Sequence, residues 1–183
     1  MKAISNFLLI NVLGWTIEGD FPDLKKSVII FAPHTSYWDG LYGKLYFMQS
    51  DISYKFLSKK EFFKFPIKYF FKAFGSIPVY KSNRYVNKIV EYFDNSEELH
   101  IVLSPEGQRR KTTHWKKGFF YMACRANVPI VVGYLDYKNK QVGIKGIIED
   151  TTDVNETMKL VADMYQNTNA KHPGNFGLDN RYS

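Results

Sequence analysis

The chain has 183 residues, a formal net charge of +7 and a single cysteine, Cys124. This length suits one domain with a sizeable buried core, and one cysteine excludes both an internal disulfide framework and a cysteine-based zinc cluster. The four histidines are scattered along the chain, so no metal site is predicted. The basic charge favours anionic partners, which include nucleic acid, anionic lipid and phosphorylated substrates.

The N-terminal stretch 1–15 is predicted to form a short amphipathic helix. We expect no signal peptide here, and the apolar run Phe7–Trp15 is much shorter than the roughly 20 residues that a bilayer crossing needs. Two interpretations stay open: the helix caps the core of the domain, or it lies on a membrane surface with its apolar face in the lipid.

Strand and helix patterns alternate along the rest of the chain. Short apolar runs between turn residues predict strands, and apolar residues at helical spacing predict helices. We expect strands within 16–20, 28–31, 54–58, 75–84, 100–103, 128–132 and 141–148, and helices at 40–48, 85–93, 119–126 and 155–165. This order predicts a single α/β domain over 16–166, with a mixed, mostly parallel sheet flanked by helices, and an irregular polar tail over 167–183.

The first candidate site follows the strand at 28–31, in Phe31-Ala-Pro-His-Thr-Ser-Tyr-Trp-Asp-Gly40. His34 and Asp39 would point about 140° apart on one continuous helix, but a loop between a strand and a helix lets them meet. A carboxylate that accepts from one imidazole nitrogen leaves the other nitrogen as a base. The alternative is that Asp39 caps a helix or turn and that His34 is an ordinary loop residue.

Lysines and phenylalanines interleave between Ser58 and Gly75, where Pro66 predicts two short helices. The aromatic residues exceed what one core-facing stripe requires. Rings at headgroup depth beside ammonium groups favour contact with an anionic membrane surface. A buried amphipathic hairpin with solvated lysines is the alternative.

A second cluster follows the strand at 100–103, in Ser104-Pro-Glu-Gly-Gln-Arg-Arg-Lys111. Arginine forks pair with phosphate or carboxylate oxygens, and Gly107 would let a ligand approach the backbone closely. Lys81 and Arg84 also lie beyond a strand end, where ligands often bind in α/β sheets. A solvated basic loop is the alternative for 104–111.

These stretches, in this order, resemble the motifs of the glycerolipid acyltransferases, typified by 1-acyl-sn-glycerol-3-phosphate acyltransferase and including lysophospholipid acyltransferases. The family's first motif, a histidine and an aspartate with four residues between them, matches His34 and Asp39. Its Gly-x-Ile-x-x-Asp-Arg motif is approximated by Gly75-Ser-Ile-Pro-Val-Tyr-Lys81, and its Pro-Glu-Gly-Thr-Arg motif by Pro105-Glu-Gly-Gln-Arg109. The remaining matches are a Lys-x-Gly at Lys116 and Gly118 and a Val-Pro-Ile at Val128–Ile130.

The resemblance implies an O-acyltransferase that moves a fatty acyl group from an acyl-CoA or acyl-carrier-protein thioester to a lysophospholipid hydroxyl. The expected acceptor is 1-acylglycerol-3-phosphate, which would give phosphatidate. His34 would act as general base and Asp39 would orient it. No metal or other cofactor is implied, and Ser36 is expected to cap the following helix rather than to carry the acyl group. The residues implied in acceptor binding are Lys81, Arg84, Glu106, Gly107, Arg109 and Lys116.

The acceptor headgroup stays open because this chain departs from the family pattern. Tyr80 and Lys81 replace the acid and arginine of the second motif, and Gln108 replaces a threonine. An amino-acid lipid or a glycolipid is therefore an alternative acceptor, and a non-catalytic lipid-binding module is an alternative function. Nucleic-acid binding is not expected, since no nucleic-acid motif occurs. We expect a peripheral protein on the cytoplasmic face of an anionic membrane.

Overall fold

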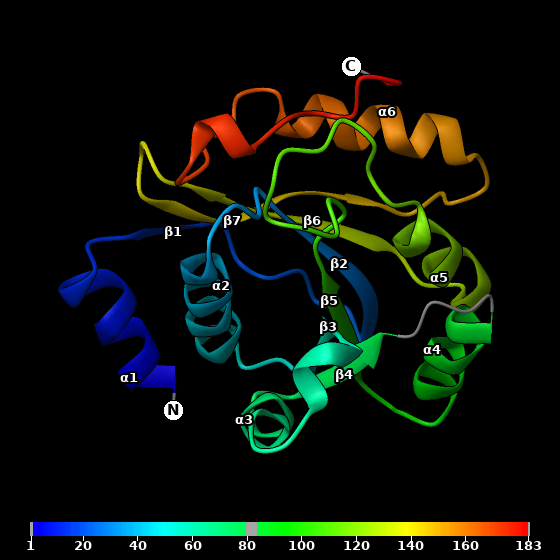
Figure 1. Cartoon of the computed structure of the whole chain (residues 1–183), viewed down its shortest axis with the longest axis horizontal. Helices are drawn as coiled ribbons and strands as arrows, with labels where there is room; N and C mark the ends of the chain where they lie inside the picture. The colour runs from blue at the N-terminus through cyan, green and yellow to red at the C-terminus, as the bar shows by residue number, and fades with distance from the viewer. Residues whose placement is uncertain (1, 80–83, 183) are drawn as a thin grey trace.

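In the computed structural model a central sheet is covered by helices on both faces (Figure 1). The structure describes residues 2–79 and 84–182, without the side chains of Phe70 and Arg84. The sheet has seven strands in the order β1-β7-β6-β2-β5-β3-β4, and all neighbouring pairs are parallel except β6 with β7. The strands are β1 Thr16–Glu18, β2 Lys26–Ala32, β3 Tyr54–Lys59, β4 Ser76–Val79, β5 Leu99–Leu103, β6 Ile130–Asp136 and β7 Gln141–Ile148. The predicted α/β fold with a mixed, mostly parallel sheet is confirmed.

The helices pack in two layers around the sheet. They are α1 Lys2–Asn6, the π-helix η1 Phe7–Val12, α2 Tyr37–Ser50, the 3₁₀-helix η2 Lys60–Phe63, α3 Ile67–Ala73, α4 Arg84–Asp94, α5 Gly118–Ala126, α6 Val154–Tyr165 and the 3₁₀-helix η3 Pro173–Asn175. One core joins buried residues of α4, α5 and α6 to one face of the sheet, and a second joins η1 and α2 to the other face.

The central strand β2 shows how the sequence produces these two cores. Side chains alternate between the two faces of a strand. Val28 and Ile30 accordingly belong to the core under α4 to α6, whereas Ile29 and Phe31 belong to the core under α2. All four are buried, as expected for a parallel strand with a helical layer on each side.

Helix α2 begins three residues earlier than predicted, at Tyr37 instead of Gly40. Ser36 is its N-cap and Asp39 completes a capping box, so polar side chains satisfy backbone N–H groups at the helix start. Two short helices flank Pro66, as predicted. Cys124 is exposed, because the buried face of α5 is formed by other residues, including Phe120 and Ala123.

The two ends of the chain both pack onto the domain. Leu9 of η1 is buried in the core under α2, while Ile4 of α1 and Phe7 and Val12 of η1 stay exposed. The tail after α6 is irregular apart from η3, and Figure 1 shows it passing over the loop between β5 and α5. Backbone and side-chain hydrogen bonds, among them Trp115 N to Asp179 Oδ2 at 3.0 Å, tie the tail to that loop. Among the residues described, no helix has the length and apolarity needed to cross a bilayer.

Candidate active site

The candidate residues gather where three adjacent parallel strands end. His34 follows β2, Glu106 follows β5 and Tyr137 follows β6, and these strands are neighbours in the order β6-β2-β5. In open α/β sheets ligands bind in the crevice outside the carboxyl ends of the strands, where the loops diverge and backbone groups become available. Side chains from distant parts of the sequence therefore meet at one place.

His34 and Asp39 meet across the loop between β2 and α2. Asp39 Oδ2 accepts hydrogen bonds from the backbone N–H groups of Thr35, at 2.6 Å, and Ser36, at 2.7 Å. His34 Nδ1 lies 3.5 Å from the same oxygen. The Asp39 carboxylate thus caps α2 and faces the imidazole at once, so the two interpretations of this residue are compatible.

The exposure of the pair suits acid–base chemistry. The Asp39 side chain is 2% exposed and that of His34 is 31% exposed. A buried carboxylate opposite Nδ1 favours the tautomer that leaves Nε2 unprotonated. His34 can then accept a proton from a group that reaches it from solvent.

The Glu106 carboxyl group holds the backbone of His34. Its Oε1 accepts a hydrogen bond from the His34 backbone N–H at 2.6 Å, and Oε2 has no partner among the described residues. Burial raises the pKa of Glu106 to about 8; the bond from His34 opposes this rise and the Asp39 charge adds to it. The predicted acceptor-binding carboxylate therefore faces the protein interior, and it is largely protonated at neutral pH.

The loop after Glu106 brings a cation to the start of α2. The Arg109 guanidinium lies 3.5 Å from the ring centroid of Tyr37, whose side chain is largely exposed. Gly107 has a positive φ of 67°, and a Cβ there would lie 3.2 Å from Lys116 Cγ. Lys116 is held by a bond from its backbone N–H to Pro105 O. The loop is thus folded tightly, with Arg109 beside the first turn of α2.

The structure leaves two of the predicted residues undecided and adds two that the sequence did not suggest. Lys81 lies outside the described residues, and Arg84 begins α4 with its side chain undescribed. Lys171, in the tail, places its Nζ 4.8 Å from the Trp38 ring centroid. Tyr137 donates a hydrogen bond from its hydroxyl to Asp39 Oδ1 at 2.5 Å. Neither residue belongs to a recognisable motif, so no sequence signal pointed to them.

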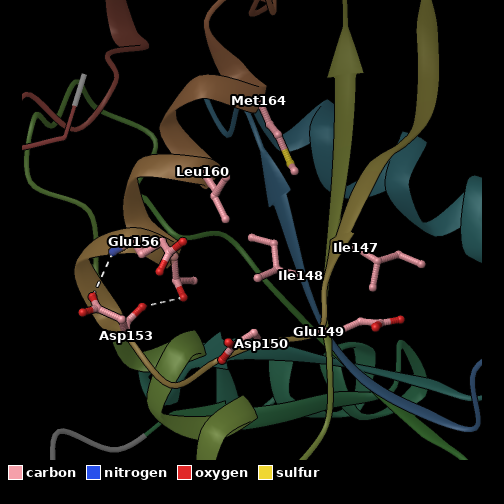
Figure 2. Close-up of a pocket in the computed structure, with 9 residues that line it drawn as sticks. Ile147, Ile148, Glu149, Asp150, Asp153, Glu156, Leu160 and Met164 are labelled. Atoms are coloured by element: carbon pink, nitrogen blue, oxygen red, sulfur yellow. Dashed lines mark hydrogen bonds between the residues drawn. The ribbon is translucent and has the colours of Figure 1, made fainter.

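A surface hollow of about 280 Å³ lies elsewhere, between β7 and α6 (Figure 2). Ile148, Leu160 and Met164 form its apolar wall, and acidic side chains such as Glu149 and Asp150 lie toward one end. Ile148 pairs with the first residue of β6, whereas His34 follows the last residue of the parallel strand β2. The hollow is therefore at the opposite end of these strands from His34. It contains none of the candidate residues. Within 2–79 and 84–182, no cluster of His, Cys, Asp or Glu suits a metal ion.

Comparison with known proteins places the chain in a family. The Acyltransferase family model matches residues 15–134, and the chain belongs to that family. The fold is similar to that in the crystal structure of the 1-acyl-sn-glycerophosphate (LPA) acyltransferase PlsC from Thermotoga maritima, with a TM-score of 0.62 and 14% sequence identity. The match covers 88% of this chain and 73% of that chain. Comparison with curated proteins gives no match. The resemblance predicted from the sequence motifs is therefore confirmed at the level of the family.

Proposed function

We propose that this protein transfers a fatty acyl group from an acyl-CoA or acyl-carrier-protein thioester to the hydroxyl of a membrane lysolipid, with 1-acylglycerol-3-phosphate as the acceptor. The observation that carries the proposal is the position of His34 Nδ1, 3.5 Å from the buried Asp39 carboxylate. The pair follows the carboxyl end of β2 in a chain of the Acyltransferase family. The similarity in fold to a lysophosphatidate acyltransferase supports the choice of acceptor.

In the proposed reaction His34 acts as the general base. Nε2 takes the proton of the acceptor hydroxyl as the oxygen attacks the thioester carbonyl, and Asp39 stabilises the imidazolium that forms. Collapse of the tetrahedral intermediate breaks the carbon–sulfur bond, and His34 returns the proton to the departing thiolate. The acyl group passes directly to the acceptor. The serine of this loop, Ser36, supports this route because its Oγ accepts a hydrogen bond from the Trp38 N–H as a helix cap.

Arg109 is the proposed ligand of the acceptor phosphate. Its stacking on Tyr37 holds the planar guanidinium near the start of α2, and a guanidinium can pair with two phosphate oxygens at once. Gly107 and Lys116 shape the same loop. Lys81 and Arg84 remain predicted acceptor ligands, and we assign Glu106 to holding the backbone of His34.

Apolar and basic side chains support a peripheral position on a membrane, which we propose to be its cytoplasmic face. Exposed apolar residues occur on α1 and η1, and again around α3, where Phe65, Ile67 and Tyr69 are exposed. Lysines alternate with these rings, and the Lys68 Nζ lies 5.0 Å from the Tyr69 ring centroid. Such a surface suits rings at headgroup depth and ammonium groups beside anionic lipid.

The experiment that tests the function is an acyl-transfer assay with acyl-CoA or acyl-carrier protein as donor. Lysophosphatidate is compared with an uncharged lysolipid and an amino-acid lysolipid as acceptor. We expect phosphatidate from lysophosphatidate, and about tenfold lower kcat/KM for Arg109→Lys, because charge is kept but the paired hydrogen-bond geometry is lost. Transfer to the other lysolipids alone would refute the phosphate acceptor. No acyl transfer to any acceptor would refute the function.

A further inference from the structure

The Asp39 carboxylate has a partner on each oxygen, and only one side involves the motif that contains it. Oδ2 accepts from two backbone N–H groups of the same loop and faces His34 Nδ1. Oδ1 accepts from the hydroxyl of Tyr137, which is 98 residues away in the sequence. A buried carboxylate oxygen needs such a donor, since an unpaired one would carry the full desolvation cost.

Tyr137 is held in place by several elements. It is the first residue after β6, in the turn that leads to β7, and its backbone N–H donates to Asn169 O in the C-terminal tail at 2.8 Å. The Asn169 side chain in turn bonds to Asp136 Oδ2 at 2.8 Å. The Tyr137 ring lies edge-on to Trp15, with centroids 5.0 Å apart. The phenol is therefore aimed at Asp39 by the sheet, by the tail and by an aromatic neighbour.

We propose that Tyr137 is a positioning residue of the acyl-transfer reaction, acting through Asp39 to set the orientation and the basicity of His34. This inference rests on the proposed function. The phenolic hydrogen bond fixes the carboxylate plane so that Oδ2 faces the imidazole. It also neutralises part of the Asp39 charge, so that Asp39 stabilises the imidazolium less than an unshared carboxylate would.

Among the described residues, the charged and titratable groups around this pair come from the His34 loop, from α2 and from the tail, where the backbone N–H of His172 donates to Thr35 Oγ1 at 3.3 Å. Asp39 and Glu106 contact the His34 loop, and Tyr42 of α2 and Lys171 of the tail face Tyr137, with the Lys171 Nζ 5.9 Å from its ring centroid. Burial raises the pKa of Tyr137, and the hydrogen bond to Asp39 raises it further. The Tyr137 hydroxyl therefore stays protonated, and remains a donor to Asp39, at neutral pH.

The decisive variant is Tyr137→Phe, which removes one hydroxyl and keeps the ring. Without the hydroxyl, the Asp39 carboxylate stabilises the His34 imidazolium with its full negative charge, so the imidazolium persists to higher pH. We expect kcat to fall about tenfold with KM within about twofold, because the bond orients the base and does not bind substrate. The acid limb of the pH–rate profile should move up by about half a pH unit. Tyr42→Phe, which removes a phenol from the same aromatic neighbourhood, serves as the control and should keep the parent profile.

A second measurement does not depend on turnover. NMR titration of the four histidines, with the His34 signal assigned by its loss in His34→Gln, gives the protonation midpoint of His34 in the parent and in Tyr137→Phe. A higher midpoint in Tyr137→Phe supports the inference. An unchanged midpoint overturns it, even if the variant turns over more slowly. A parent without acyl transfer would refute the proposed function, while this titration would still decide the role of Tyr137.

Discussion

The corner around His34 and Asp39 and the lysine–phenylalanine segment between Lys59 and Phe74 are built in opposite ways. In the corner a buried carboxylate is bonded by backbone and phenol donors, and a second buried carboxyl holds the His34 backbone. In the segment rings stack on rings, such as Phe62 on Phe71 at 4.9 Å, while Phe65 stays 77% exposed. Directional hydrogen bonds fix atoms for chemistry, whereas non-directional apolar and charged groups suit a fluid, variable surface.

The largest effect should come from the corner. His34→Ala removes the proposed base, so we expect turnover to fall about 10²–10⁴-fold with the fold retained. His114→Ala is the matched control, because His114 is exposed and its ring bonds only to the neighbouring Thr113 among the described residues. The measurement is thioester consumption by each purified variant. Turnover near the parent value in folded His34→Ala would show that the corner does not do the chemistry.

The second effect should come from the segment and should leave the chemistry intact. Replacing Lys60, Lys64 and Lys68 with Glu should weaken binding to anionic vesicles about 100-fold or more at low salt, since each lysine near a membrane contributes about 1 kcal/mol. The parent should lose affinity as salt rises, because surface attraction is screened. Vesicle sedimentation measures both.

A matched triple variant separates this surface from overall charge. Glutamates at Lys25, Lys88 and Lys159, which lie before β2, in α4 and in α6, give the same net charge, +7 − 6 = +1. We expect this variant to bind anionic vesicles more tightly than the first. Equal losses in the two triple variants would mean that net charge, and not the segment, directs the protein to membranes.

The third prediction concerns the buried carboxyl under His34. Glu106 has a pKa of about 8 in the folded chain against an ordinary value near 4.5, so the folded state keeps a proton that the unfolded state has lost. Stability is therefore full below about pH 4.5 and falls as the pH rises through about 8. Glu106→Gln cannot ionise, so its free energy of unfolding relative to the parent should increase by about 2 kcal/mol between pH 6 and pH 8.

Urea unfolding at several pH values measures this difference. Glu91→Gln, at an exposed position on α4, is the control and should follow the parent across that range. Curves for Glu106→Gln and the parent that run parallel from pH 6 to pH 8 would mean that the carboxyl is ionised in the folded protein. The corner would then tolerate a second negative charge beside Asp39, and its proposed electrostatics would be wrong.

Sequence reasoning reached the parts of this molecule that local patterns specify. The apolar run Val28–Phe31 predicted the strand β2, and the spacing of His34 and Asp39 predicted that these two side chains can meet. Tyr137 could not be found this way, because its bond to Asp39 depends on how the β6 end packs beside α2. The burial of Glu106 likewise depends on distant strands. The early start of α2 could have been predicted from Ser36 and Asp39, whose spacing is that of a capping box.

The smallest effect tests whether the corner holds a nucleophile. Ser36 is nearly buried, and its Oγ accepts from the Trp38 N–H at 3.3 Å, so its hydroxyl is used by the helix. Ser36→Ala should cost about 1 kcal/mol of stability through the lost cap, with turnover of the folded enzyme close to that of the parent. Ser36→Asn keeps a good cap without a hydroxyl, so it should retain both stability and turnover. Unfolding curves and single-turnover assays measure the two properties separately. If both variants lost turnover while Ser36→Asn stayed stable, an acyl-enzyme on Ser36 would replace direct transfer, because a capping role cannot distinguish Asn from Ser whereas a nucleophile must.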